Sequence, residues 1–226
     1  TGGGRVGRTE NAVSGTARVL RVNPAGCVLE DLAPAAAWLR AGGVVATPTD
    51  TLYGLAVDIR NPAAVRQLFA LKGRDARAAL PLIAADLSQV VACGGRLDSR
   101  EAALATAFWP GPLSIVRDAP SWIVPEVHGG HRTVAIRIPA HPVARRLCEA
   151  WGGVLSATSA NLTGAPAADR VEALGAIATD PRVLVIDAGV TPGGLPSTLV
   201  DVRAARPLLL REGAIPWSRV LDFLHA

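Results

Sequence analysis

The order in which strand-like and helix-like segments follow one another limits the fold of this chain more than any other feature. Apolar runs with strand character lie at 44–47, 113–116, 133–139 and 154–159, and segments of helical pattern separate most of them. Three more runs, at 182–189, 197–202 and 207–213, follow one another with no helix between them. A regular parallel barrel needs a helix after every strand. This order therefore predicts a single α/β domain with one mixed β-sheet flanked by helices.

Helices are predicted where capping residues bracket a helical pattern. The clearest begins at Asn61 and Pro62, an asparagine cap with proline in the first turn, and continues through AAVRQLFALKG. A helix over Glu30–Ala41 is ended by two glycines. Further helices are expected at 99–109, 141–153 and 169–178 and over Pro216–Leu224, and further strands at 17–22 and 81–87.

The chain of 226 residues is long enough to bury a core, and half of its residues are apolar, which indicates a globular protein. Residues 1–22 are rich in glycine and arginine and predict a mobile tail ahead of a domain over 23–226. No apolar run approaches the roughly 18 residues of a membrane helix, and no secretory signal is visible. We therefore expect a cytoplasmic protein. Three distant cysteines, Cys27, Cys93 and Cys148, predict buried thiols and neither a disulfide frame nor a zinc site.

The charge balance favours an anionic partner such as a nucleotide or RNA. Basic residues exceed acidic ones by 23 − 19 = 4, which is a modest excess. Lys72 is the only lysine, so the other 23 − 1 = 22 basic residues are arginines, a bias more typical of genome composition than of nucleic-acid binding. Tyr53 is likewise the only tyrosine, and both residues lie near a cluster of threonines.

Polar side chains recur at or just beyond the ends of the predicted strands. They are Thr49, Thr51, Arg137, Ser156, Ser159 and Asn161. In open α/β sheets, ligands collect outside such strand ends, so this placement predicts a binding site. The alternative interpretation is that these side chains end strands only because they form good turns.

Three generic ligand motifs are excluded. Gly2, Gly4 and Gly7 satisfy G-x-G-x-x-G, but no strand precedes them, as a dinucleotide site would require. The one lysine lies in LKGR, so the chain has no Walker A loop. His128 and His131 lack an acidic or cysteine partner at a suitable spacing, so no metal site is predicted.

Seven blocks occur in an order that resembles a known family. They are PTDTLYGL, LKGR, WPGPLSIV, AIRIP, SATSANLTG, PSTLVD and LREG, and the resemblance extends from about Val44 to Gly213. Together they resemble the YrdC-like threonylcarbamoyl-adenylate synthases in their short, single-domain form, a more specific signal than any one block. The resemblance implies a twisted, mixed α/β sheet with a deep, concave, basic pocket.

The resemblance also implies an activity. The family makes L-threonylcarbamoyl-adenylate and pyrophosphate from L-threonine, bicarbonate or carbon dioxide, and ATP, with Mg²⁺ carried in by the nucleotide. Partner proteins then transfer the threonylcarbamoyl group to an adenosine of tRNA. In-line attack on the α-phosphorus needs positioning and charge stabilisation, which fits a chain without a Ser-His-Asp or paired-carboxylate arrangement.

Site residues are implied block by block. Lys72 and Arg74 resemble a catalytic clamp for phosphate and carboxylate, and we expect Lys72 to be an exposed cation. The residues implied in substrate binding are Thr49, Thr51, Tyr53, Ser114, Arg137, Ser156, Ser159 and Asn161. Those implied in nucleotide binding are Lys72, Arg74, Ser159, Asn161, Ser197 and Arg211, and no residue is assigned to a metal.

Two departures from the family pattern and two other functions stay open. Ser114 stands where the family commonly has threonine, and Leu80 stands where some members have a lysine, so a second cation is missing or is supplied by Arg77. The chain is alternatively a non-catalytic relative that binds double-stranded RNA or tRNA, or a carbamoyl-adenylate enzyme that uses carbamoyl phosphate. Any tRNA affinity of a synthase should be weak and salt-dependent.

Overall fold

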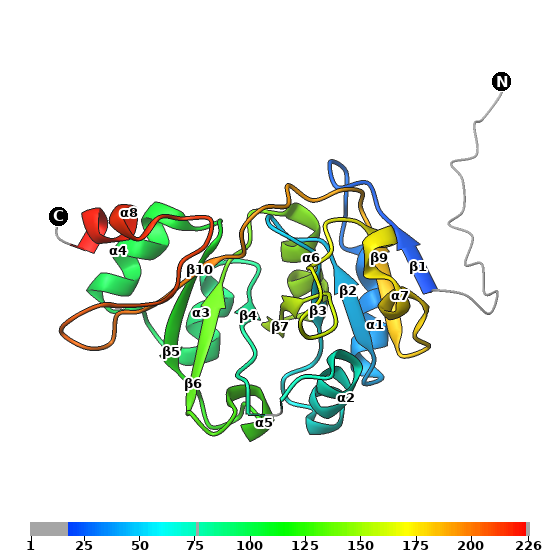
Figure 1. Cartoon of the computed structure of the whole chain (residues 1–226), viewed down its shortest axis with the longest axis horizontal. Helices are drawn as coiled ribbons and strands as arrows, with labels where there is room; N and C mark the ends of the chain where they lie inside the picture. The colour runs from blue at the N-terminus through cyan, green and yellow to red at the C-terminus, as the bar shows by residue number, and fades with distance from the viewer. Residues whose placement is uncertain (1–17, 76, 225–226) are drawn as a thin grey trace.

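The computed structural model describes residues 18–75 and 77–224. Two mixed β-sheets lie side by side along the longest axis of the molecule, with helices packed around them (Figure 1). The mixed α/β class is confirmed, and the strands are shared between two sheets where one was expected. Residues 1–17, most of the predicted tail, lie outside the described part of the chain. The strand expected at 17–22 is confirmed as β1.

Among the described residues, the first sheet holds five strands and the second holds six. Across the first sheet lie β1 (Arg18–Arg21), β9 (Val183–Asp187), β2 (Val44–Thr47), β3 (Gly54–Ala56) and β8 (Thr158–Ser159). Across the second lie β11 (Leu208–Arg211), β10 (Thr198–Asp201), β5 (Leu113–Asp118), β6 (Thr133–Arg137), β4 (Leu82–Ile83) and β7 (Leu155–Ser156). Each sheet combines parallel and antiparallel pairs, and neither is built from one continuous stretch of chain.

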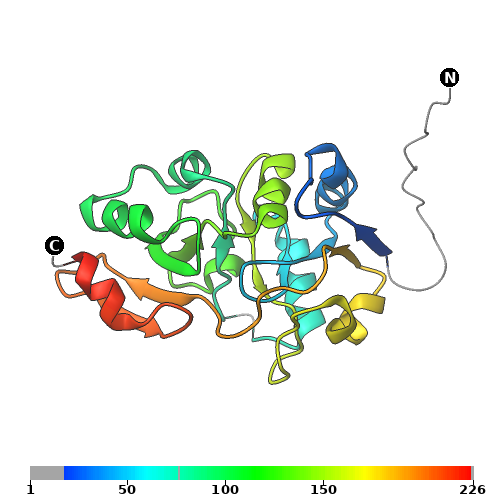
Figure 2. The ribbon, with the colours of Figure 1, turned by 90° about the horizontal axis from the view of Figure 1, so that it is seen from above.

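Helices pack around the two sheets. They are α1 (Ala33–Arg40), α2 (Pro62–Lys72), α3 (Leu87–Gly94), α4 (Ser99–Phe108), α5 (Pro125–His128), α6 (Pro142–Trp151), α7 (Ala176–Thr179) and α8 (Trp217–Leu224). Figure 2 shows α4 and α8 together at one end of the molecule and β1 at the other. The segment between β9 and β10, coloured orange, passes from the first sheet to the second in both views. No helix in the described ranges is long and apolar enough to cross a membrane.

The helix predicted to begin at Asn61 is confirmed as α2. The Asn61 side chain accepts hydrogen bonds from the backbone N–H groups of Ala63 at 3.0 Å and Ala64 at 3.2 Å. The helix ends at Gly73, whose φ of 59° is left-handed and suits glycine. Lys72 is the last residue of the helix and Arg74 follows the Gly73 cap, so the two caps fix the positions of both side chains.

Four predicted segments differ from the structure. The strand expected at 154–159 is divided at Ala157 into β7 of the second sheet and β8 of the first. The strand expected at 81–87 is limited to β4, because Asp86 caps α3 by accepting a hydrogen bond from the Gln89 N–H at 3.0 Å. The helix expected at 169–178 is divided at Gly175, whose φ is 55°, into a 3₁₀ turn and α7. The helix expected over Glu30–Ala41 begins as a 3₁₀ turn before α1.

One apolar core joins the two sheets. Its largest cluster includes Leu55 of β3 and Val185 of β9, from the first sheet, and Leu82 of β4 and Ile136 of β6, from the second. All four side chains are fully buried or nearly so. The sheets therefore share a core, and the strand ends that meet above it are held at fixed positions. The three cysteines are buried free thiols, as predicted.

Candidate active site

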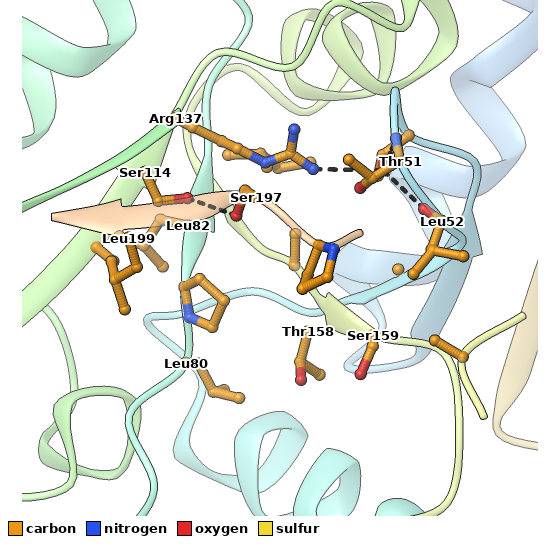
Figure 3. Close-up of a pocket in the computed structure, with 18 of the residues that line it drawn as sticks. Thr51, Leu52, Leu80, Leu82, Ser114, Arg137, Thr158, Ser159, Ser197 and Leu199 are labelled. Carbon is orange, nitrogen blue, oxygen red and sulfur yellow. Dashed lines mark hydrogen bonds between the residues drawn. The ribbon is translucent and has the colours of Figure 1, made fainter. Parts of the chain in front are cut away.

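A cavity of about 460 Å³ is lined by residues of both sheets (Figure 3). All but two of the predicted site residues line it: Thr49, Thr51, Tyr53, Arg74, Ser114, Arg137, Ser159, Asn161, Ser197 and Arg211. The other two, Lys72 and Ser156, lie behind the lining. The polar side chains at the strand ends therefore converge on one site, which favours the binding-site interpretation over the turn interpretation.

The turn after β2 is held by the hydroxyl group of Thr49. This hydroxyl donates to the Leu52 carbonyl at 2.6 Å and accepts from the Thr51 N–H at 3.2 Å. The Thr51 hydroxyl lies 3.1 Å from it. Both threonines are buried and face the cavity, so their hydroxyl groups are fixed in place before any ligand arrives.

Tyr53 forms one wall of the cavity and anchors the segment between β9 and β10. Its hydroxyl group donates to the Gly189 carbonyl at 2.8 Å, and the Gly193 N–H donates to the Thr51 carbonyl at 2.8 Å. Burial raises the pKa of Tyr53 to about 12. The phenol is therefore neutral at physiological pH and serves as a wall and a hydrogen-bond donor, not as a base.

Arg137 reaches the cavity from the end of β6. Its guanidinium forms an ion pair with Asp50, and the two side chains are 9% and 10% exposed. A second terminal nitrogen donates to the Thr49 hydroxyl at 3.3 Å. The side chain thus crosses from the second sheet to the turn of the first (Figure 3).

Arg74 and Arg211 enter from other sides. Arg74 donates to the Thr158 hydroxyl and to the Ala79 carbonyl, both at 2.9 Å. Arg211 donates to the Ser197 carbonyl at 2.8 Å and to its hydroxyl group at 3.1 Å. That hydroxyl lies 3.0 Å from the Ser114 hydroxyl, so the serine that replaces the family threonine joins this network.

The positive charge of three arginine side chains favours the binding of an anion in the cavity. Burial lowers the pKa of Arg74 and of Arg211, and the charges of Arg137 and Arg74 lower the pKa of Arg211 further. No carboxylate side chain lines the cavity in the described part of the chain. Three guanidinium groups therefore converge with too little counter-charge, and a bound anion would relieve their repulsion.

Lys72 differs from its prediction as an exposed cation, because the residue is only 3% exposed. Its ammonium group donates to the backbone carbonyl of Ser159, to the carbonyl of Asn161 at 2.7 Å and to the Asn161 side-chain oxygen at 3.2 Å. Burial, followed by the charge of Arg74, lowers the pKa of Lys72 to about 8. Its contacts are those of a group that holds the 159–161 segment against the cavity.

Ser156 is also placed behind the lining, where its hydroxyl accepts a hydrogen bond from the Val57 N–H at 2.9 Å. Leu80 is buried and lines the cavity, whereas Arg77 is exposed and is not among the lining residues. Sequence reasoning missed Thr158, which lines the cavity, and Asp50, which pairs with Arg137. Both lie inside blocks that resemble the family, each between two predicted site residues.

Comparisons with known proteins agree on one family. Residues 37–213 match the Sua5/YciO/YrdC family model, which carries the description "Telomere recombination". The threonylcarbamoyl-AMP synthase of Stenotrophomonas maltophilia is 43% identical over 70% of this chain and 84% of its own length. The synthase of Bacillus subtilis is 38% identical over 84% of this chain and 55% of its own length. The crystal structure of Pyrococcus abyssi Sua5 complexed with L-threonine is similar with a TM-score of 0.85 and 31% identity, over 91% of this chain and 60% of that one. The chain thus spans little more than half of the longer relatives.

Proposed function

The chain belongs to the Sua5/YciO/YrdC family, and we propose that it is an L-threonylcarbamoyl-adenylate synthase. It would join L-threonine, bicarbonate or carbon dioxide, and ATP, and release pyrophosphate. The observation that carries this proposal is the cavity, in which three arginines face a set of fixed hydroxyl groups. Such a lining suits an amino-acid carboxylate and a phosphate chain bound side by side.

The reaction needs positioning more than proton transfer. The threonine amine bonds to the carbon of CO₂ and gives up a proton to solvent, which forms the N-carboxylate; bicarbonate gives the same product with loss of water. One oxygen of this N-carboxylate attacks the α-phosphorus of ATP, forming an O–P bond. The bond from the α-phosphorus to the bridging β-phosphate oxygen breaks, and its electron pair leaves with pyrophosphate. Charge develops on the phosphate oxygens, and Arg74 and Arg211 are placed to stabilise it. Mg²⁺ would arrive as part of the nucleotide substrate, because the lining offers no carboxylate ligand in the described residues.

We assign the two ends of the cavity to different substrates. The turn with Thr49, Thr51 and Tyr53, together with Arg137, would hold the amino acid and the carbamate. Arg211 and the hydroxyl groups of Ser197 and Ser114 would hold the nucleotide. Arg74, with Ser159 and Asn161, would lie between them and contact the reacting phosphate. Lys72 would act through the 159–161 segment.

Partners follow from the product. A mixed anhydride of a carbamate and AMP reacts with water, so a tRNA-modifying transfer protein in the cytoplasm would take it up quickly. Direct tRNA binding by this chain would be weak and salt-dependent, because an excess of only four basic residues offers mostly phosphate contacts.

The test is pyrophosphate release by the pure protein supplied with ATP, bicarbonate and single amino acids. We expect release only when threonine and bicarbonate are both present. Serine should be poorer by roughly 10- to 200-fold, the value of one methyl contact. Release without an amino acid, or with carbamoyl phosphate alone, would contradict the proposed reaction. Tight, salt-insensitive tRNA binding without pyrophosphate release would favour an RNA-binding protein.

A further inference from the structure

Asp50 lies next to the cavity without lining it. It occupies the turn after β2, between Thr49 and Thr51, both of which face the cavity. Its carboxylate pairs with the Arg137 guanidinium at a site where both side chains are about nine-tenths buried. The second carboxylate oxygen, Oδ2, is buried and has no hydrogen-bond partner among the described residues. A carboxylate held in this costly position needs a reason other than stability.

Two consecutive residues hold the two terminal nitrogens of Arg137. Asp50 accepts from Nη1, and the Thr49 hydroxyl accepts from Nη2 at 3.3 Å. Arg137 belongs to the second sheet and the turn to the first, so this contact fixes the guanidinium across the cavity. Because the guanidinium is planar, fixing two nitrogens also fixes the direction of its remaining N–H donors.

The same ion pair divides the charge of the cavity unequally. The charge of Arg137 is matched by Asp50. Arg74 and Arg211 have no carboxylate within ion-pair distance in the ranges that the structure covers, and they bind only carbonyl and hydroxyl oxygens. The turn side is therefore nearly neutral, whereas two charges remain uncompensated on the other side. A singly charged carboxylate suits the first environment, and a multiply charged phosphate chain suits the second.

We propose that Asp50 is a positioning residue. It orients Arg137 so that the guanidinium binds the amino-acid carboxylate, and it thereby keeps the phosphate chain at Arg74 and Arg211. This inference rests on the proposed function, because it needs an amino acid and a nucleotide in one cavity. Asp50 acts through Arg137 and contacts neither substrate. It determines at which end of the cavity the carboxylate and the phosphate chain bind.

The test compares the binding of two substrates by calorimetry in Asp50→Asn. The Kd of L-threonine should rise on the order of 10-fold or more, because Arg137 loses its fixed direction. The Kd of ATP should stay the same or fall, because the cavity gains net positive charge. In steady-state kinetics, the KM for threonine should rise more than kcat falls. A merely structural role would weaken both ligands together.

Glu101→Gln is the matched control. Glu101 pairs with Arg117 at 2.9 Å, and these side chains are 7% and 9% exposed, but neither residue lines the cavity. This substitution should lower thermal stability and leave both Kd values unchanged. Asp50→Glu provides a second variant in case the asparagine variant does not fold. It keeps the charge and displaces the guanidinium by one methylene, so threonine affinity should still fall on the order of 10-fold.

The outcomes separate the two proposals. If the wild type binds no threonine and releases no pyrophosphate, the proposed function fails and this inference fails with it. If the wild type is active but Asp50→Asn weakens threonine and ATP equally, or changes neither, only the role of Asp50 is refuted. Wild-type threonine affinity in Asp50→Glu would also refute positioning, since charge alone would then be sufficient.

Discussion

Lys72 is the residue whose substitution best separates a positioning role from direct contact with phosphate. Its ammonium group donates to three oxygens of the 159–161 segment. Lys72→Met keeps most of the buried stem and removes all three donors. A hydrogen bond to a charged group contributes about 1.5–3 kcal/mol, but Ser159 is exposed and its segment can bind water instead. We therefore expect Lys72→Met to lower the free energy of unfolding by about 2 kcal/mol.

Turnover should fall much more than stability. Ser159 and Asn161 line the cavity, and a displacement of about 1 Å in a positioned group costs about 10²-fold in rate. Pyrophosphate release should therefore drop by about 10²-fold in Lys72→Met. We expect a similar drop in Lys72→Arg, because a planar guanidinium cannot direct its donors at three oxygens arranged around one nitrogen. Urea unfolding and steady-state assays on the same samples give both quantities.

The control is Arg66→Met on the same helix. Arg66 is 61% exposed and pairs with Glu126 on the surface, so its loss should change neither stability nor turnover appreciably. A Lys72→Met protein that unfolds at the wild-type urea concentration while its KM for ATP rises would refute the reasoning. Lys72 would then be the direct phosphate ligand that the sequence predicted. Full activity in Lys72→Arg would show that charge alone is sufficient.

Three further substitutions or conditions test the described geometry. Because burial lowers the pKa of Lys72 to about 8 from 10.5 when unfolded, the unfolded chain binds more protons between these values. Stability should rise from pH 8 to pH 10 by about 2 kcal/mol more in the wild type than in Lys72→Met, as measured by urea titration. Ser156→Ala should lower the free energy of unfolding by about 1 kcal/mol and leave the KM values for threonine and ATP unchanged, because the lost hydrogen bond lies behind the cavity lining. In Gly213→Ala, the added Cβ would overlap the Pro196 carbonyl and displace Ser197, so the KM for ATP should rise, whereas Gly153→Ala, with open space around it, should be neutral.

The family and most of the cavity lining could be predicted from the sequence because each block is a local segment. PTDTLYGL, for example, contains a complete turn whose hydrogen bonds form between neighbours such as Thr49 and Thr51. The convergence of Arg74, Arg137 and Arg211 could not be predicted from any local segment. These side chains come from the end of a helix and from two strands, and only the paired sheets bring them together.

The burial of Lys72 could not be read from its position. A lysine in the last turn of a helix usually reaches solvent or the helix carbonyls. Here its acceptors lie 87 and 89 residues further along the chain. The segment that carries them is placed by β8, which pairs with β3 at the edge of the first sheet. A tertiary contact of this range overrides the local pattern.

Two of the errors in the predicted secondary structure have local causes. In PLIAADL the apolar pattern predicted one strand, but Asp86 is a good helix cap and starts α3 within the same run. In DRVEALGAIA the helical pattern continues through Gly175, whose left-handed φ breaks the helix. In both segments one capping or breaking residue outweighed the hydrophobic pattern. Neither error displaced a predicted site residue, since those lie at other strand and helix ends.

The described contacts explain how the cavity could accelerate the proposed reaction through charge stabilisation. Each arginine of the cavity already binds a carbonyl, hydroxyl or carboxylate oxygen of the protein, so its direction is set before substrate binds. Preorganised charges of this kind need little rearrangement as negative charge moves toward the leaving pyrophosphate. Tyr53, which lines the same cavity, is held neutral by its raised pKa. Turnover should then fall above about pH 8, because deprotonation of the Lys72 ammonium group leaves two N–H donors for three acceptors. The 159–161 segment would be held less firmly against the cavity.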